Sequence, residues 1–213
     1  MNKVRFRYSK LGSSKFISHL DLMATMQRSF IRAGIELKYS EGFNPHPFLS
    51  VALPLSVGYG SLCELMDVGV VGEELPDISL FSLPDGIKLL DVYTSVRKFS
   101  EIKWVKVQGE VQYDREFSQD FICELNNAYE KSSIIISKRS KRGVKEIDIA
   151  PHIKDVEFIL NDDKIITVSG KISAQEPTLN VNDLLTALGD NLKPDYSDIN
   201  RVELFDKNME RFE

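Results

Sequence analysis

Three residues in the first quarter of the sequence have side chains that can carry acid–base chemistry. His19 and Asp21 are separated by one residue, and His46 follows in the stretch 39–55, YSEGFNPHPFLSVALPL. Two histidines suffice for metal-independent RNA cleavage, because one acts as general base and the other as general acid. The same three side chains are metal ligands, but positions i and i+2 of a helix do not share a face, so the spacing matches no specific metal motif. An endoribonuclease using His19 and His46 is therefore one hypothesis, and we expect no metal site.

The stretch around His46 is predicted to be stiff. Pro45 and Pro47 fix φ and hold Asn44 and His46 in extended conformations, while Gly42 allows a turn with positive φ. This stiffness has a purely structural interpretation. It also suits a recognition site, because side chains that are already held still lose less entropy on binding. The candidate residues of this site are Tyr39, Glu41, Asn44 and His46, together with His19 and Asp21.

The elements before the stiff stretch would position it. Residues 3–8, KVRFRY, alternate between apolar and basic side chains, which predicts a strand with one buried face and a basic outer face carrying Arg5 and Arg7. Ser18 and Asp21 have the spacing of a capping box, and an apolar stripe follows, so we expect a helix over 18–33 that ends at Gly34. A second strand is expected at 35–39.

The order strand–helix–strand occurs twice along the chain. The second series begins with a strand at 104–113 and a helix at 117–129, and it includes a hairpin over 156–172 turned at 161–163. We therefore predict an α+β protein of two tandem ferredoxin-like (βαββαβ) halves, the second with an extra hairpin. Residues 1–97 would form the half with the HLD and EGFNPHP motifs, and residues 102–213 the half with a basic tip at 138–142.

Length and composition exclude several classes of protein. The chain has 213 residues, of which 42% are hydrophobic and 28% charged, as in ordinary globular proteins. It has no apolar run of the roughly 18 to 20 residues needed to span a membrane, and its N-terminus lacks the apolar core of a signal peptide. Cys63 and Cys123 are far apart and belong to no Cys/His cluster, so we expect neither disulfides nor zinc. We expect a cytoplasmic protein without a membrane partner.

Charge is distributed unevenly. The net charge of −5 argues against nucleic-acid binding, yet residues 1–40 carry eight basic side chains against two acidic ones, and residues 131–145 carry six basic and no acidic ones. Such patches attract polyanions locally, although solvated surfaces explain them equally well. The stretch 136–145, ISKRSKRGVK, predicts a basic hairpin tip that would contact phosphates without reading sequence. The predicted RNA contacts are Arg5, Arg7, Arg28, Arg32, Lys138, Arg139, Lys141 and Arg142, and no DNA partner is expected.

A family resemblance covers most of the chain and is most specific over residues 19–67. It rests on His19-Leu-Asp21, Arg28, Arg32-Ala-Gly34, Tyr39-Ser, the EGFNPHP stretch, Ala52-Leu-Pro-Leu55, Gly58 and Ser61-x-x-Glu64, and later on the stretch 146–151, EIDIAP. With these motifs the sequence resembles the bacterial radical-SAM-linked proteins, a domain of unknown function encoded beside, or fused to, B12-binding-type radical SAM proteins. Glu41 and Phe48 stand where the family pattern has glutamine and lysine. The resemblance implies a radical SAM protein as partner.

These observations lead to one main functional hypothesis. The chain would be a non-catalytic accessory module that binds RNA, or a radical SAM partner that modifies RNA, and presents one to the other. It has no cysteine triad for an iron–sulfur cluster, so we expect no cofactor of its own and assign any radical chemistry to the partner. The alternatives are the endoribonuclease using His19 and His46, and a pure protein-interaction subunit whose contact surface is the segment 43–55.

Overall fold

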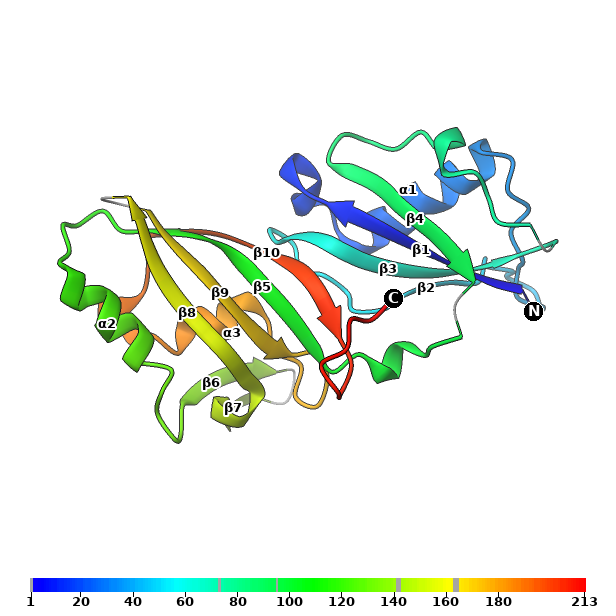
Figure 1. The fold of residues 1–213 in the computed structure, drawn as a ribbon. Coiled ribbons are helices and arrows are strands. Elements are labelled where there is room, and N and C mark those ends of the chain that lie inside the picture. The colour runs from blue at the N-terminus through cyan, green and yellow to red at the C-terminus, as the bar shows by residue number, and fades with distance from the viewer. Residues whose placement is uncertain (1, 73, 95, 141–142, 163–164) are drawn as a thin grey trace. The chain divides into compact units, whose positions relative to one another are not determined.

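The chain is a mixed α+β protein in which antiparallel strands predominate and helices are few, which confirms the predicted α+β class. The structure, a computed structural model, describes residues 2–72, 74–94, 96–140, 143–162 and 165–213. Two compact units are present, Met1–Phe99 with Glu213, and Ser100–Phe212 (Figure 1). Within the described residues, no helix is both long enough and apolar enough to cross a bilayer.

The first unit is a four-stranded antiparallel sheet with one long helix. Its elements are β1 (Asn2–Lys10), η1 (Gly12–Phe16), α1 (His19–Arg32), β2 (Leu49–Val51), β3 (Gly60–Val70), η2 (Ile78–Leu80) and β4 (Ile87–Thr94), and the 3-10 turn η3 (Phe99–Glu101) follows. The strands lie in the order β4-β1-β3-β2. The predicted strand at 35–39 is wrong: only isolated bridges form there, because the chain turns back at once and β2 takes the next positions along β3.

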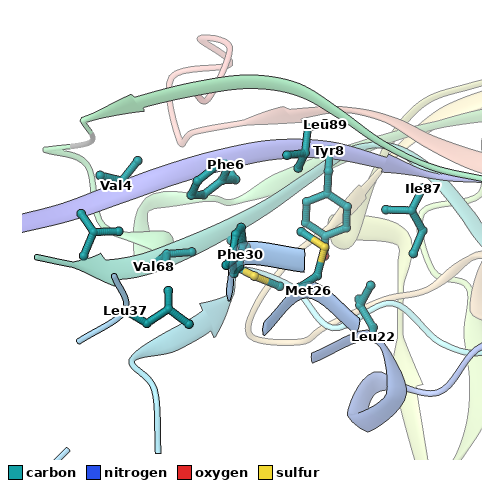
Figure 2. Packing of buried hydrophobic residues seen from close by; sticks show 12 residues of the cluster. Val4, Phe6, Tyr8, Leu22, Met26, Phe30, Leu37, Val68, Ile87 and Leu89 are labelled. Carbon is teal, nitrogen blue, oxygen red and sulfur yellow. The ribbon is translucent and has the colours of Figure 1, made fainter. Parts of the chain in front are cut away.

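The core of this unit lies between the sheet and α1. Val4, Phe6 and Tyr8 point from β1 toward the helix, as their alternation predicts. Leu22, Met26 and Phe30 of α1 meet them, and Figure 2 shows these side chains together. The rings of Phe6 and Phe30 lie 4.9 Å apart between centroids. Replacing such a buried ring by alanine typically costs about 3–5 kcal/mol, so this contact fixes α1 on the sheet.

The second unit repeats the combination of antiparallel sheet and helices. Its elements are β5 (Trp104–Gln112), α2 (Gln119–Asn127), β6 (Ile135–Ser140), β7 (Gly143–Asp148), η4 (Ala150–His152), β8 (Ile153–Asp162), β9 (Ile165–Ser173), α3 (Val181–Thr186), α4 (Gly189–Leu192) and β10 (Tyr196–Phe205). The order in the sheet is β10-β5-β9-β8, and β6 and β7 form a separate two-stranded sheet. Strand β5 needs glycine at 109, because a Cβ there would lie 2.0 Å from the carbonyl oxygen of Asp198.

Candidate functional site

The start of α1 is fixed by a buried lysine at the end of β1. The Nζ of Lys10 donates hydrogen bonds to the carbonyl oxygens of Lys15 at 3.3 Å and Ile17 at 3.2 Å. Burial lowers the pKa of Lys10, while the nearby Glu64 carboxylate acts in the opposite direction. The Lys10 side chain therefore fastens the turn before α1 to the sheet. In this way it helps to position the first turn of the helix, which carries the HLD motif.

Asp21 has a structural role at this helix start. Ser18 is the N-cap and its hydroxyl oxygen accepts a hydrogen bond from the backbone N–H of Asp21, which confirms the predicted cap. The same hydroxyl donates to Oδ2 of Asp21 at 2.7 Å. His19 is exposed on the first turn, and among the described residues no hydrogen bond or ion pair is found for its ring.

The EGFNPHP stretch forms a loop whose two ends are fastened together. We call residues 39–47 the motif loop. The N–H of Ser40 donates to the carbonyl oxygen of His46 at 2.9 Å, and the N–H of His46 donates to Oγ of Ser40 at 3.1 Å. Oγ of Ser40 also lies 3.0 Å from Nδ1 of His46, and Tyr39 pairs with Pro47. Ser40 and His46 therefore close the loop through both backbone and side-chain contacts.

The motif loop is also attached to the sheet. The N–H of Phe48 donates to the carbonyl oxygen of Lys38 at 2.9 Å, and the carbonyl oxygen of Phe48 accepts from the N–H of Gly69 at 2.8 Å. The tip 41–45 is exposed, and Gly42 adopts φ of 117° as a turn with glycine allows. Phe43 stands at this tip with a relative exposure of 111%. A phenylalanine held entirely in solvent on a fastened loop is the most unusual surface feature of the first unit.

His46 and His19 do not form an acid–base pair in this fold. The motif loop joins β3 near its end, where Leu37 pairs with Val70. The start of α1 lies near the beginning of β3, where Lys10 pairs with Ser61. These two positions are about 30 Å apart along the strand at 3.3 Å per residue. In the described part of the chain no hydrogen bond or ion pair links His46 to His19 or Asp21, and no group of three or more His, Cys, Asp or Glu side chains could hold a metal ion.

The prediction that Arg5 lies exposed on the outer face of the sheet is wrong. Its side chain is 1% exposed, and Nε and Nη2 donate to the two carboxylate oxygens of Asp67 at 2.7 and 3.1 Å. Nη2 also donates to the carbonyl oxygen of Arg97, and the guanidinium lies 4.3 Å from the ring centroid of Phe99. Strand alternation does place Arg5 opposite the α1 side of the sheet, but that face is covered here. Arg5 is therefore part of a buried ion pair and cannot contact a phosphate.

The other predicted basic contacts of the first unit are more accessible. Arg28 and Arg32 are exposed on α1, and Arg7 on β1 is half-buried. Arg32 uses Nη2 for a hydrogen bond to the carbonyl oxygen of Ser82 at 2.9 Å, which leaves its other N–H groups toward solvent. No single track of phosphate contacts results, because Arg5 is removed from the predicted set.

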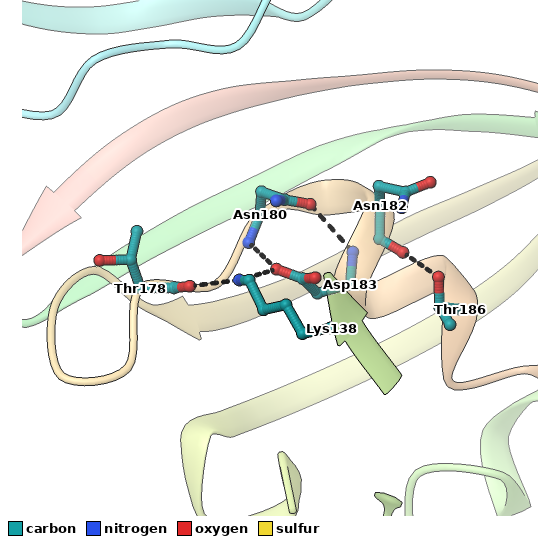
Figure 3. A network of polar contacts seen from close by, with 6 residues as sticks. All are labelled: Lys138, Thr178, Asn180, Asn182, Asp183 and Thr186. Carbon is teal, nitrogen blue, oxygen red and sulfur yellow. Dashed lines mark hydrogen bonds and ion pairs between the residues drawn. The ribbon is translucent and has the colours of Figure 1, made fainter. Parts of the chain in front are cut away.

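Lys138 also has a structural partner. Its Nζ donates to Oδ2 of Asp183 at 2.6 Å and to the carbonyl oxygen of Thr178 at 2.7 Å. Asp183 belongs to the capping box of α3 with Asn180, and Figure 3 shows how the lysine joins this network from β6. Nζ of Lys138 therefore already has two partners within the second unit, and the contact of Lys138 with an RNA phosphate stays a prediction. Lys141, Arg142 and the Arg139 side chain lie outside the described residues.

A comparison with protein families assigns the chain. The family model described as "Uncharacterized protein conserved in bacteria (DUF2344)" matches residues 3–194. The chain belongs to the DUF2344 family. No curated protein matches the sequence significantly. A solved structure of an unknown protein from Galdieria sulphuraria is similar at 9% identity and a TM-score of 0.26, covering 100% of this chain and 99% of that one, and this similarity is too low to support any argument about fold or function.

This DUF2344 chain also has a surface cavity in the second unit, which the sequence analysis did not predict. It measures about 540 Å³ and lies between α2 and β8, with Asn126 and Tyr129 on one wall and residues 153–157 on the other. The side chain of Asn126 makes two hydrogen bonds with the backbone of Phe158. It accepts one from the N–H and donates the other to the carbonyl oxygen. The Tyr129 hydroxyl donates to the carbonyl oxygen of Leu184, and burial raises its pKa. These two polar groups therefore hold α2 in place.

Phe43 is the residue of the candidate site that the sequence analysis did not select, because the polar side chains around it were the candidates. The sequence pattern drew attention to Tyr39, Glu41, Asn44 and His46, and it included Phe43 only at the beginning of the possible interaction segment 43–55. The available signal was the glycine before it and the two prolines after it, which together make a protruding turn. In this DUF2344 chain, His46 helps to close the loop, and Phe43 is the side chain that the loop exposes to solvent.

Proposed function

We propose that this chain is a non-catalytic accessory module of the bacterial cytoplasm that binds a partner protein through the motif loop. The observation that carries the proposal is the full exposure of Phe43 on a loop closed by Ser40 and His46. A large aromatic side chain in such a position is well suited to be an interface anchor, because it brings much apolar surface to the partner. A loop that is already fastened loses little conformational entropy on binding.

The partner we propose is a radical SAM enzyme that modifies RNA. The support for this is the resemblance of residues 19–67 to the radical-SAM-linked proteins, since the motif loop lies within that region. In this arrangement the radical chemistry belongs to the enzyme, and the module contributes binding and orientation.

RNA is a second candidate ligand of the same loop. An exposed aromatic ring stacks on unpaired bases, and base stacking contributes about 1–3 kcal/mol per base. Phe43 offers such a ring, and Lys38 is exposed at the neck of the loop. Glu41 at the tip opposes this role because its carboxylate repels phosphates. We therefore place the protein partner first.

We also propose that both units are ferredoxin-like. The support is the strand order, because β4-β1-β3-β2 and β10-β5-β9-β8 both follow the pattern 4-1-3-2 when the four strands of each sheet are numbered along the chain. In the first unit η2 would stand for the second helix, and in the second unit β6–β7 would be the extra hairpin.

The experiment compares affinity-tagged wild-type chain with Phe43→Ser in extracts of a bacterium that encodes the protein. Proteins and RNA that copurify are identified, with and without RNase treatment. We expect a radical SAM protein with the wild type, resistant to RNase, and its loss with Phe43→Ser. The matched control is Val71→Ser, which removes another exposed apolar side chain of the same unit. Recovery of the same proteins with Phe43→Ser contradicts the proposal, and recovery of RNA alone favours the second candidate.

A further inference from the structure

Helix α1 carries two exposed apolar side chains outside its core face, one near each end. Leu20 and Ile31 are 78% and 52% exposed. Leu20, Ala24, Gln27 and Ile31 follow the spacing i, i+4, i+7, i+11 and therefore lie on one line along the helix, with Ala24 and Gln27 half-buried between the exposed ends. The core contacts Leu22, Met26 and Phe30 face the sheet from another side of the helix. Burial of the core face therefore leaves Leu20 and Ile31 exposed to solvent. We call this line the stripe.

The flank of the stripe has opposite charges at its two ends. Asp21, Arg28 and Arg32 follow the spacing i, i+7, i+11, so they share one flank next to the stripe. Asp21 lies beside Leu20, and Arg32 lies beside Ile31. Each of the two end charges retains polar atoms for another contact, because among the described residues Asp21 uses only Oδ2, with Ser18, and Arg32 uses only Nη2, with Ser82.

We propose that the solvent face of α1 is the contact surface of a two-fold symmetric dimer of this chain. In an antiparallel pair of α1 helices, Leu20 of one copy meets Ile31 of the other, and the middle positions 24 and 27 meet each other. Flanks of the same kind face each other in such a pair, so Arg32 of one copy approaches Asp21 of the other, and the contact occurs twice. The order of apolar and charged side chains along this face is thus complementary to itself.

Charge selects the antiparallel orientation and the second copy as occupant. A parallel pair would bring like charges on the two copies to the same end, which is unfavourable. An unrelated helix would need the same reversal of charge along its own flank. The exposed side chains of Phe16 and Val57 add apolar area at the Leu20 end, where the N–H of Gly58 donates to the carbonyl oxygen of Lys15. A contact made chiefly by one helix is at the small end of specific interfaces, about 1,000 Å², so dimerisation should depend on concentration.

The first test is sedimentation velocity of the purified chain over a range of concentrations. We expect a reversible monomer–dimer equilibrium for the wild type. Leu20→Glu and Ile31→Glu should each raise the dissociation constant at least tenfold, roughly the effect of losing an interface anchor. Val71→Glu, at another exposed apolar position of the same unit, serves as control and should leave it unchanged. A wild type that stays monomeric at every concentration, or a dimer insensitive to Ile31→Glu, overturns the proposal.

The second test reverses the charges. Arg32→Asp and Asp21→Arg should each weaken the dimer, and the double variant Asp21→Arg/Arg32→Asp should restore it, because the pair is rebuilt with the charges exchanged. Circular dichroism accompanies each variant, since Asp21 also takes part in the helix cap. Failure of the double variant to recover while both single variants remain helical excludes the proposed contact. Phe43→Ser should not change the equilibrium, so failure of the dimer and failure of partner binding are distinguishable.

Discussion

The motif loop of the first unit and the β6–β7 hairpin of the second are two projections whose polar residues attract attention in the sequence. In the motif loop, Ser40 and His46 bond to each other, and the tip with Phe43 remains free in solvent. In the hairpin, Lys138 bonds to Asp183 and Thr178, so the strand is tied to the helix α3. The first set of polar contacts is internal to the loop, and the second connects separate elements.

This difference shows that a polar side chain can serve a binding surface in two indirect ways. It can hold a loop in shape so that an apolar residue is presented, as His46 does. It can also bond to a second element and hold the two elements together, as Lys138 and Arg5 do. In both cases the polar residue itself is a poor candidate for ligand contact, and the effect of removing it should appear in stability.

The largest effect is expected at Arg5. Among the described residues, Arg5→Ala leaves the buried Asp67 carboxylate with Lys3 as its one ion-pair partner, whose ammonium lies 3.2 Å away and whose side chain is half exposed. Breaking a buried ion pair from one side typically costs about 3–5 kcal/mol. Urea unfolding should therefore show a loss of this order, while Lys3→Ala should cost about 1 kcal/mol or less. Equal losses for the two variants would show that burial of Arg5 contributes little.

A smaller loss is expected for Lys138→Ala. Its two hydrogen bonds join β6 to the capping box of α3, and a hydrogen bond to a charged group contributes about 1.5–3 kcal/mol. The matched control is Lys145→Ala, because Lys145 is exposed and pairs directly opposite Lys138 on β7. Urea unfolding should show a loss for Lys138→Ala and almost none for Lys145→Ala. If instead Lys138→Ala leaves stability intact and lowers the salt dependence of RNA binding, the basic tip is a phosphate contact after all.

Ser40→Ala should affect the motif loop without affecting the fold. The variant loses the two contacts that Oγ of Ser40 makes with His46, and one such hydrogen bond contributes about 0.5–1.5 kcal/mol. Hydrogen exchange should become faster at the N–H of His46, while α1 is unchanged. Ser50→Ala, at an exposed position of β2, is the control. Unaltered exchange at His46 would mean that the prolines alone keep the loop closed.

The sequence predicts those parts of the fold whose cause is local. The alternation of Val4, Phe6 and Tyr8 identifies β1, and Ser18 identifies the start of α1, because each signal depends on neighbours within a few positions. The stiffness of the loop follows from Gly42 and its prolines in the same way.

The remainder depends on partners that are distant along the chain. Asp67 lies 62 residues from Arg5, and Asp183 lies 45 residues from Lys138, so neither basic side chain could be recognised as structural from its own surroundings. No strand forms at 35–39, because β2 pairs with the neighbouring positions of β3 and leaves only an isolated bridge at Leu37. Within the motif loop, Ser40 and His46 are six residues apart, a separation that fits no standard turn. Their contact could therefore not be predicted from the sequence.

The smallest effect concerns pH and the base of the hairpin. Oδ1 of Asp148 accepts hydrogen bonds from the N–H of Ile134 at 2.9 Å and the N–H of Ala150 at 3.0 Å. These backbone N–H groups lower the pKa of Asp148 in the folded state below its ordinary value of 3.8. Because the folded-state pKa is the lower one, the contribution of Asp148 to stability is present above pH 3.8 and is lost as the pH falls through the folded-state pKa. Asp148→Asn should therefore be less stable than the wild type at pH 7, and the difference should shrink on acidification. Urea midpoints of both proteins from pH 7 to pH 2.5 measure this, and a difference that stays constant over the range would show that the carboxylate charge is irrelevant to the hairpin.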